Sequence, residues 1–176
     1  MYNKSNVNKW VKESLKKNKH LICKDGYLCD GFIVLRIDNV VLELLNKELK
    51  TWNGQNFQYK NNQFEFDNDK IFDVKGIIDN SKSKSNNIYK ATSLLYDFDN
   101  VRAKLYASDH NFVALDINFV ELLSNPEYYM IYGDNNNSPL LFMDRDFDVE
   151  LLILPVRIKG DILKESLLLL SGAALW

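Results

Sequence analysis

The stretch IYKATSLLYDFDNVRAKLYA, residues 88 to 107, decides the fold class. Two strand-like runs, Ile88 to Phe98 and Val101 to Ala107, flank Asp99-Asn100, a dipeptide typical of a tight turn. In the second run every other residue is apolar, so one face of this strand is expected to point toward a core. A turn this short joins antiparallel neighbours, and the pair therefore predicts an antiparallel sheet.

Strand-like runs also lie on both sides of this pair. They are His20 to Lys24, Tyr27 to Ile37, Phe112 to Leu115, Tyr128 to Tyr132, Leu140 to Met143 and Glu150 to Ile158. A further hairpin with one aromatic face is predicted around Asn61-Asn62, where Phe57, Tyr59, Phe64 and Phe66 alternate with polar residues. Such a face either packs on the core or stacks single-stranded bases.

Three helices are predicted between the strands. Residues 6 to 19 place apolar side chains at helical spacing and their lysines on a separate arc. Residues 40 to 50 follow a cap at Asp38 or Asn39, and Ile117 to Leu123 form a shorter helix. Single helices among dominant strands favour an α+β fold with a mainly antiparallel sheet and two to four helices.

The length of 176 residues predicts one domain with one core. The element order repeats weakly, which suggests half-units of about 1–78 and 88–158. Residues 79–87, rich in Ser, Lys and Asn, are predicted to form a flexible loop, and residues 159–176 an apolar C-terminal tail helix.

Composition narrows the function classes. Hydrophobic residues at 46% exclude wholesale disorder, and the net charge of −2 argues against a protein that coats nucleic acid with its whole surface. Positive charge is concentrated in residues 1 to 20, which hold six lysines and one glutamate. The high Asn, Lys and Ile content suggests the AT-rich genome of a low-GC bacterium or its phage.

The same sequence predicts a cytoplasmic protein. The lysine-rich N-terminus lacks the apolar run of a signal peptide, and the apolar window from Ile162 to Trp176 is shorter than the roughly 20 residues that a membrane helix needs. Cys23 and Cys29 are predicted to be thiols without a disulfide.

Motifs for catalysis are missing from the sequence. There is no phosphate loop, nucleophile elbow or His-Glu-x-x-His, and only His20 and His110 could serve acid–base chemistry. Together with Cys23 and Cys29, the two histidines match no common zinc spacing. The sequence predicts a non-catalytic protein without a metal or cofactor; an enzyme that uses scattered carboxylates with a divalent metal is the weakest alternative.

The C-terminal third resembles the last domain of the bacterial replicative DNA sliding clamp. The resemblance rests on residues 137–142, on the acidic turn at 144–148, and on residues 151–158, which end in Pro155-Val156-Arg157-Ile158. Residues 103–123 are similar to the half-domain repeat of clamps in their order of strand, turn, strand and short helix. The resemblance covers about a third of the chain, roughly residues 101 to 158.

This resemblance implies a DNA-associated replication factor that contacts phosphates through lysine-bearing helices. The first helix suits that role, with Lys9, Lys12, Lys16 and Lys19 as the predicted DNA-contacting residues. The helices at 40–50 and 117–123 depart from the family because they carry glutamates. A clamp ring of such short chains also requires a homo-oligomer.

A second hypothesis is a protein-interaction module that inhibits a host defence or replication enzyme. Its contact surface would be the aromatic hairpin or the tail beyond residue 158, which clamps do not have. The predicted partner-binding residues are Leu167, Leu168, Leu175 and Trp176. Exposing them would be costly at about 25 cal/mol per Å² of apolar surface, so the chain's own core or a partner protein must cover them.

Overall fold

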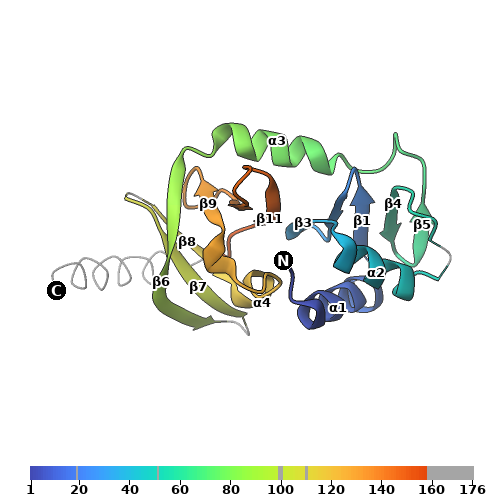
Figure 1. The fold of residues 1–176 in the computed structure, drawn as a ribbon, viewed down its shortest axis with the longest axis horizontal. Coiled ribbons are helices and arrows are strands. Elements are labelled where there is room, and N and C mark those ends of the chain that lie inside the picture. The colour runs from blue at the N-terminus through green and yellow to red at the C-terminus, as the bar shows by residue number, and fades with distance from the viewer. Residues whose placement is uncertain (19, 51, 99–100, 110, 158–176) are drawn as a thin grey trace.

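The structure is a computed structural model that describes residues 1–18, 20–50, 52–98, 101–109 and 111–157. Within these residues the fold is α+β with one antiparallel sheet of 11 strands (Figure 1). The strands are β1 His20–Lys24, β2 Tyr27–Cys29, β3 Ile33–Arg36, β4 Phe57–Lys60, β5 Gln63–Glu65, β6 Asn87–Phe98, β7 Val101–Ala107, β8 Phe112–Asp116, β9 Met130–Gly133, β10 Leu140–Met143 and β11 Val149–Ile153. The predicted antiparallel α+β class is confirmed.

The strand order is β5-β4-β1-β2-β3-β11-β10-β9-β6-β7-β8. Strands from residues 20–65 therefore lie on one side of the sheet and strands from residues 87–153 on the other. They meet where β3 pairs with β11, with Val34 opposite Leu152. The hairpin quoted first above is present as β6 paired with β7, and a register shift interrupts this pairing between Ala91 and Leu95.

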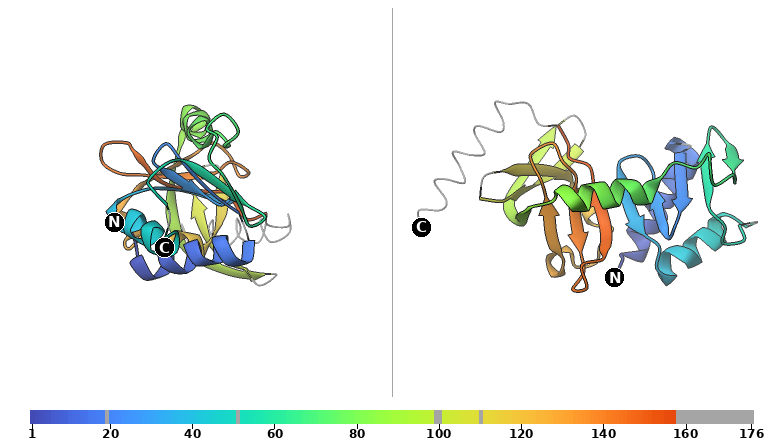
Figure 2. Two further views of the ribbon diagram at one scale, coloured as in Figure 1. Left: turned by 90° about the vertical axis from the view of Figure 1, so that its right-hand side faces the viewer. Right: turned by 90° about the horizontal axis from the view of Figure 1, so that it is seen from above.

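Helices cover both faces of the sheet (Figures 1 and 2). They are α1 Lys4–Glu13 with a π-turn at Ser14–Asn18, α2 Asn39–Glu48, α3 Val74–Lys84, α4 Ile117–Val120 and a 3-10 turn at Pro126–Tyr128. The larger core lies between the sheet and α1, α2 and α4, and includes Trp10, Leu45 and Phe142. The opposite face packs Val74 and Ile78 of α3 against Ile22 and Leu152. No described helix is long and apolar enough to cross a lipid bilayer.

Two local predictions are confirmed with their cause. The side chain of Asp38 accepts a hydrogen bond from the Val41 N–H at 2.9 Å and caps α2. Asn61 and Asn62 have φ angles of 53° and 65°, the left-handed conformation that a two-residue hairpin turn between β4 and β5 requires.

The predicted flexible loop at 79–87 is wrong over most of its length, because α3 runs from Val74 to Lys84. Asp73 caps this helix by accepting a hydrogen bond from the Gly76 N–H at 2.9 Å. Val74 and Ile78, one helical turn apart, are buried against the sheet. Packing therefore overrides the weak helix propensity of the Ser- and Asn-rich sequence.

The predicted strand at Tyr128 to Tyr132 is shifted to β9, Met130–Gly133, and two other predicted strands differ more. The run from Tyr27 to Ile37 is a hairpin of β2 and β3, because the chain turns at Asp30-Gly31 and Gly31 has a φ of +96°. The run from Glu150 to Ile158 leaves the sheet after Ile153, before Pro155. The Pro155-Val156-Arg157 segment that carried the resemblance is therefore outside any strand, and Ile158 lies outside the described residues.

The N-terminal residues also join the two sides of the sheet. Tyr2 is buried and its hydroxyl donates to Glu150 at 2.9 Å or to the Arg36 carbonyl oxygen at 2.8 Å. The Asn3 N–H donates to the Leu122 carbonyl oxygen at 2.8 Å. The helix predicted at 117–123 is reduced to α4, since Leu123 instead forms a β-bridge with Tyr2.

Candidate functional site

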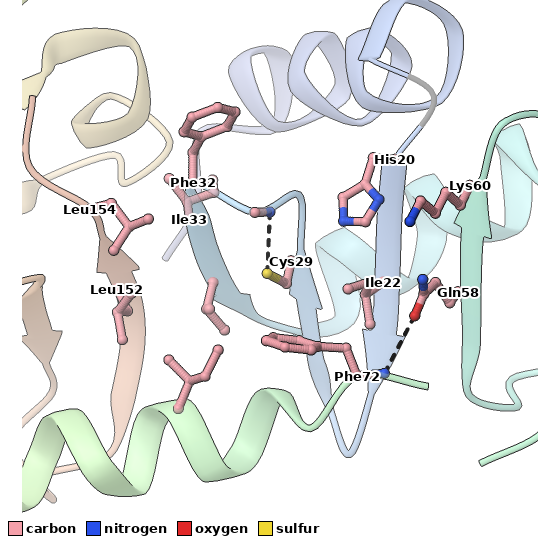
Figure 3. Close-up of a pocket in the computed structure, with 13 residues that line it drawn as sticks. His20, Ile22, Cys29, Phe32, Ile33, Gln58, Lys60, Phe72, Leu152 and Leu154 are labelled. Atoms are coloured by element: carbon pink, nitrogen blue, oxygen red, sulfur yellow. Dashed lines mark hydrogen bonds between the residues drawn. The ribbon is translucent and has the colours of Figure 1, made fainter. Parts of the chain in front are cut away.

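An apolar groove of about 350 Å³ lies on the face of the sheet that also carries α3 (Figure 3). Its lining side chains come from five adjacent strands, from α3 and from the segments beside them. They are His20, Ile22, Cys29, Gly31, Phe32, Ile33, Val34, Gln58, Lys60, Phe72, Ile77, Leu152 and Leu154. This surface is called the apolar groove below.

The rim of the apolar groove is made of large side chains that the fold leaves open to solvent. Phe32 is 59% exposed, Phe72 50% and Leu154 41%. A backbone hydrogen bond from the Leu154 N–H to the Phe32 carbonyl oxygen, 2.9 Å, holds two of them together at the end of β11. Exposed apolar side chains beside a concave apolar floor are typical of a surface that binds another polypeptide segment.

The position of Phe32 depends on a buried carboxylate. Asp30 is 5% exposed and accepts hydrogen bonds from the Trp10 indole N–H at 2.6 Å and from the N–H groups of Phe32 and Ile33. These bonds fix the turn between β2 and β3 against α1. The exposed ring of Phe32 is therefore set in place by a satisfied polar group in the core.

The apolar groove contains few polar side chains. Its polar side chains are His20, Gln58 and Lys60, and Gln58 accepts a hydrogen bond from the Phe72 N–H at 3.4 Å. Cys29 is its one thiol, and burial raises the pKa of this thiol to about 11. At neutral pH the group is therefore the protonated thiol, which is a poor nucleophile.

A second surface lies on the opposite face of the sheet. Helix α1, its π-turn and α2 pack side by side and are called the helical layer below. The helical layer holds six lysines, Lys4, Lys9, Lys12, Lys16, Lys17 and Lys47, and three glutamates, Glu13, Glu43 and Glu48. It is therefore net positive in a chain whose overall charge is −2.

Of the four predicted DNA-contacting lysines, two are exposed, one is in an ion pair and one lies outside the described residues. Lys9 and Lys16 are exposed, whereas Lys12 lies 3.5 Å from Glu48 of α2 in an ion pair. Lys4 and Lys17 are paired as well, with Glu43 and Glu13. Lys19 lies outside the described residues, as do the predicted partner-binding residues Leu167, Leu168, Leu175 and Trp176.

The aromatic hairpin is divided between core and solvent. Phe57 is buried, while Phe64 and Phe66 are exposed and stack with ring centroids 5.8 Å apart. Glu65 and Asp67 lie in the same segment, so carboxylates accompany the exposed rings. This charge disfavours the base-stacking interpretation, because single-stranded nucleic acid brings phosphates with its bases.

The described metal-ligand candidates divide between the two faces of the sheet, and His20 lines the apolar groove together with Cys29. Cys23 belongs to the core under the helical layer and Cys29 to the α3 face, while His110 lies outside the described residues. Among the described residues, no cluster of three or more His, Cys, Asp or Glu side chains could hold a metal ion.

Comparisons with known proteins give no family for the chain: no family model, no curated protein and no solved structure matches it.

Proposed function

We propose that this chain is a non-catalytic, clamp-like accessory protein of DNA replication that contacts duplex DNA through its helical layer. The observation that carries the proposal is the surplus of lysines on α1 and α2, with Lys9 and Lys16 exposed on α1. Surface ion pairs such as Lys17 with Glu13 contribute at most about 1 kcal/mol, so phosphates can compete for lysines of this kind.

Contacts of this kind are sequence-independent and depend on salt, because lysines that neutralise phosphates release counterions. With few lysines available per chain, one copy would bind weakly. A homo-oligomer, which a clamp ring requires, would bind DNA more tightly because each chain contributes its own phosphate contacts. Light scattering on the purified chain measures the oligomer, and a strict monomer would exclude a ring.

The test is fluorescence anisotropy with a labelled DNA duplex at several salt concentrations. We expect Lys9→Glu plus Lys16→Glu to lower the affinity by at least about tenfold at low salt and to flatten its salt dependence. The matched control, Lys84→Glu plus Lys90→Glu, makes the same charge change at exposed positions outside the helical layer. Equal losses in both double variants, or no binding by the unaltered chain, would refute the proposal.

A second candidate function is a protein-interaction module that binds a host or phage protein, for instance to inhibit a defence or replication enzyme. The apolar groove is the observation that favours it. A partner recovered by the unaltered chain should be lost with Leu154→Asp at the rim of the groove. Leu42→Asp, at a comparably exposed leucine of α2, should leave the partner bound. Loss with both variants or with neither would count against the groove.

The two surfaces lie on opposite faces of one sheet, so they can be occupied together. An accessory protein that holds DNA on one side and a protein on the other needs this arrangement. Measuring DNA affinity with the groove variant, and partner recovery with the lysine variant, separates the two functions.

A further inference from the structure

We propose that the chain's own C-terminal segment, Ile162 to Trp176, occupies the apolar groove and that a partner protein must displace it. The displacement step rests on the second candidate function above, because it assigns a regulator to the same groove. The occupancy itself depends only on the groove and the tail.

The first argument is the place where the described chain ends. Leu154 lines the apolar groove, and Arg157, three residues later, is the last described residue. Hydrogen bonds fix this exit: the Leu154 N–H donates to Phe32 and the Val156 N–H donates to Ala114 at 2.8 Å. The described chain therefore passes the edge of the groove at Leu154 and ends three residues later, near Ala114 of β8.

The second argument is length. From β11 the groove runs across β3, β2 and β1 to β4, which is four strand spacings or about 19 Å. Because hydrogen bonds hold Leu154 and Val156, the free link is the five residues from Arg157 to Ile162, which span up to about 17 Å. The way back from Arg157 to the groove edge at Leu154 is three residues, or at most about 10 Å. Fifteen residues, from 162 to 176, measure about 22 Å as a helix and more when extended. The segment can thus reach and cover the whole groove.

The third argument is chemical. After Glu165 the tail carries no charged side chain, and it contains the run Leu167 to Leu170 and then Leu175-Trp176. The groove offers an apolar floor with exposed Phe32, Phe72 and Leu154 around it. A tethered segment acts at an effective concentration in the millimolar range, so it outcompetes the tail of a second copy.

Photocrosslinking in the full chain tests the occupant directly. The photoreactive analogue p-benzoylphenylalanine is placed at Phe72, whose exposed ring stands at the groove, and the products are identified by peptide mass spectrometry. We expect monomer-mass products joined to residues 162–176. The same analogue at Phe147, equally exposed but outside the groove, should not yield them. Products of dimer mass, or no product within the tail, would overturn the proposal.

Cysteine labelling gives a second measurement. A cysteine that replaces Phe32 at the rim, where the side chain is 59% exposed, reports on the groove, whereas Cys23 lies in the core on the other face of the sheet and serves as an internal reference. In the Phe32→Cys background we expect Leu167→Asp plus Leu168→Asp to raise the alkylation rate of the introduced cysteine by about tenfold and to leave that of Cys23 unchanged. Ser166→Asp plus Ser171→Asp, in the same tail, should change neither rate.

An unchanged rate at the introduced cysteine, or an equal rise at this cysteine and Cys23, would contradict coverage of the groove by the tail. Neither experiment contains DNA or a partner protein. Failure of the DNA-binding test therefore leaves this inference intact, and failure of this inference leaves the lysine surface intact.

Discussion

At the scale of single residues, Asp30 is a buried polar group on which the turn between β2 and β3 depends. It is a buried carboxylate that accepts hydrogen bonds from three neutral N–H donors, one of them the indole of Trp10. Charge-assisted bonds of this kind are stronger than neutral ones. We expect Asp30→Ala to lower the free energy of unfolding by about 2 to 4 kcal/mol, measured by urea denaturation. Asp109→Ala, at an exposed carboxylate, should change it by less than about 0.5 kcal/mol.

The buried thiols predict how stability changes with pH. Burial raises the pKa of Cys29 from an ordinary value of 9.0 to about 11 and that of Cys23 to about 12. The unfolded chain therefore releases these protons near pH 9, while the folded chain keeps them. The stabilisation is complete below pH 9 and is lost as the pH rises toward 11 and 12.

The measurement is the free energy of unfolding at several pH values between 8 and 10.5. We expect Cys29→Ala to be less stable than the unaltered chain at pH 8 but to lose about 1 to 2 kcal/mol less across this range. Leu42→Ala, which removes no titrating group, should keep the full pH dependence. Parallel curves for all three proteins would refute the burial of Cys29.

Single residues also mark where sequence reasoning succeeded and where it stopped. Asp38 and Asn61-Asn62 were predictable because their roles depend on neighbours in the chain. Asp30-Gly31 is also a typical turn dipeptide, but it lies within an apolar run that was predicted as one continuous strand. Phe32 and Phe72 gave no sequence signal as groove residues, because only the pairing of distant strands brings them together.

At the scale of elements, α3 is the clearest correction. Its sequence, VKGIIDNSKSK, has weak helix propensity, so tertiary packing decides its structure. Ile78 is 4% exposed and packs on the sheet. We expect Ile78→Ala to lower the free energy of unfolding by about 2 to 4 kcal/mol. The change should also loosen the packing of α3 beside Ile77, which lines the groove. Ile88→Ala, at a side chain 59% exposed, should cost much less. Equal costs, measured by denaturation, would contradict the packing of α3.

β7, with alternating apolar residues, and β10, a continuous apolar run, were predicted with their observed bounds. The strand ends were less predictable. β11 stops at Ile153 although the apolar sequence continues, because Leu154 turns out of the sheet to line the groove. The same turn separates the Pro155-Val156-Arg157 segment from the strand that the clamp resemblance assigned to it.

At the scale of the whole molecule, one strand pairing, called the seam below, decides whether the two sides of the sheet unfold together. The pairing of β3 with β11 is the only direct strand contact between residues 20–65 and 87–153 in the described part of the chain. Leu151 stands opposite Leu35 at this seam, and both are fully buried in the larger core. Tyr2 adds a second connection through Glu150 and Arg36.

A shared core and a shared seam predict a single cooperative unit. We expect Leu151→Ala to cost about 2 to 4 kcal/mol and to speed amide hydrogen exchange by a similar factor at Leu21 of β1 and Leu105 of β7, which lie on either side of the seam. Leu95→Ala, at a side chain 44% exposed, should leave both rates nearly unchanged. If exchange accelerates at Leu105 alone, the two sides open independently. The helical layer would then belong to a separately folding unit, whereas the apolar groove, which includes Leu152 of β11, would still need both sides of the seam.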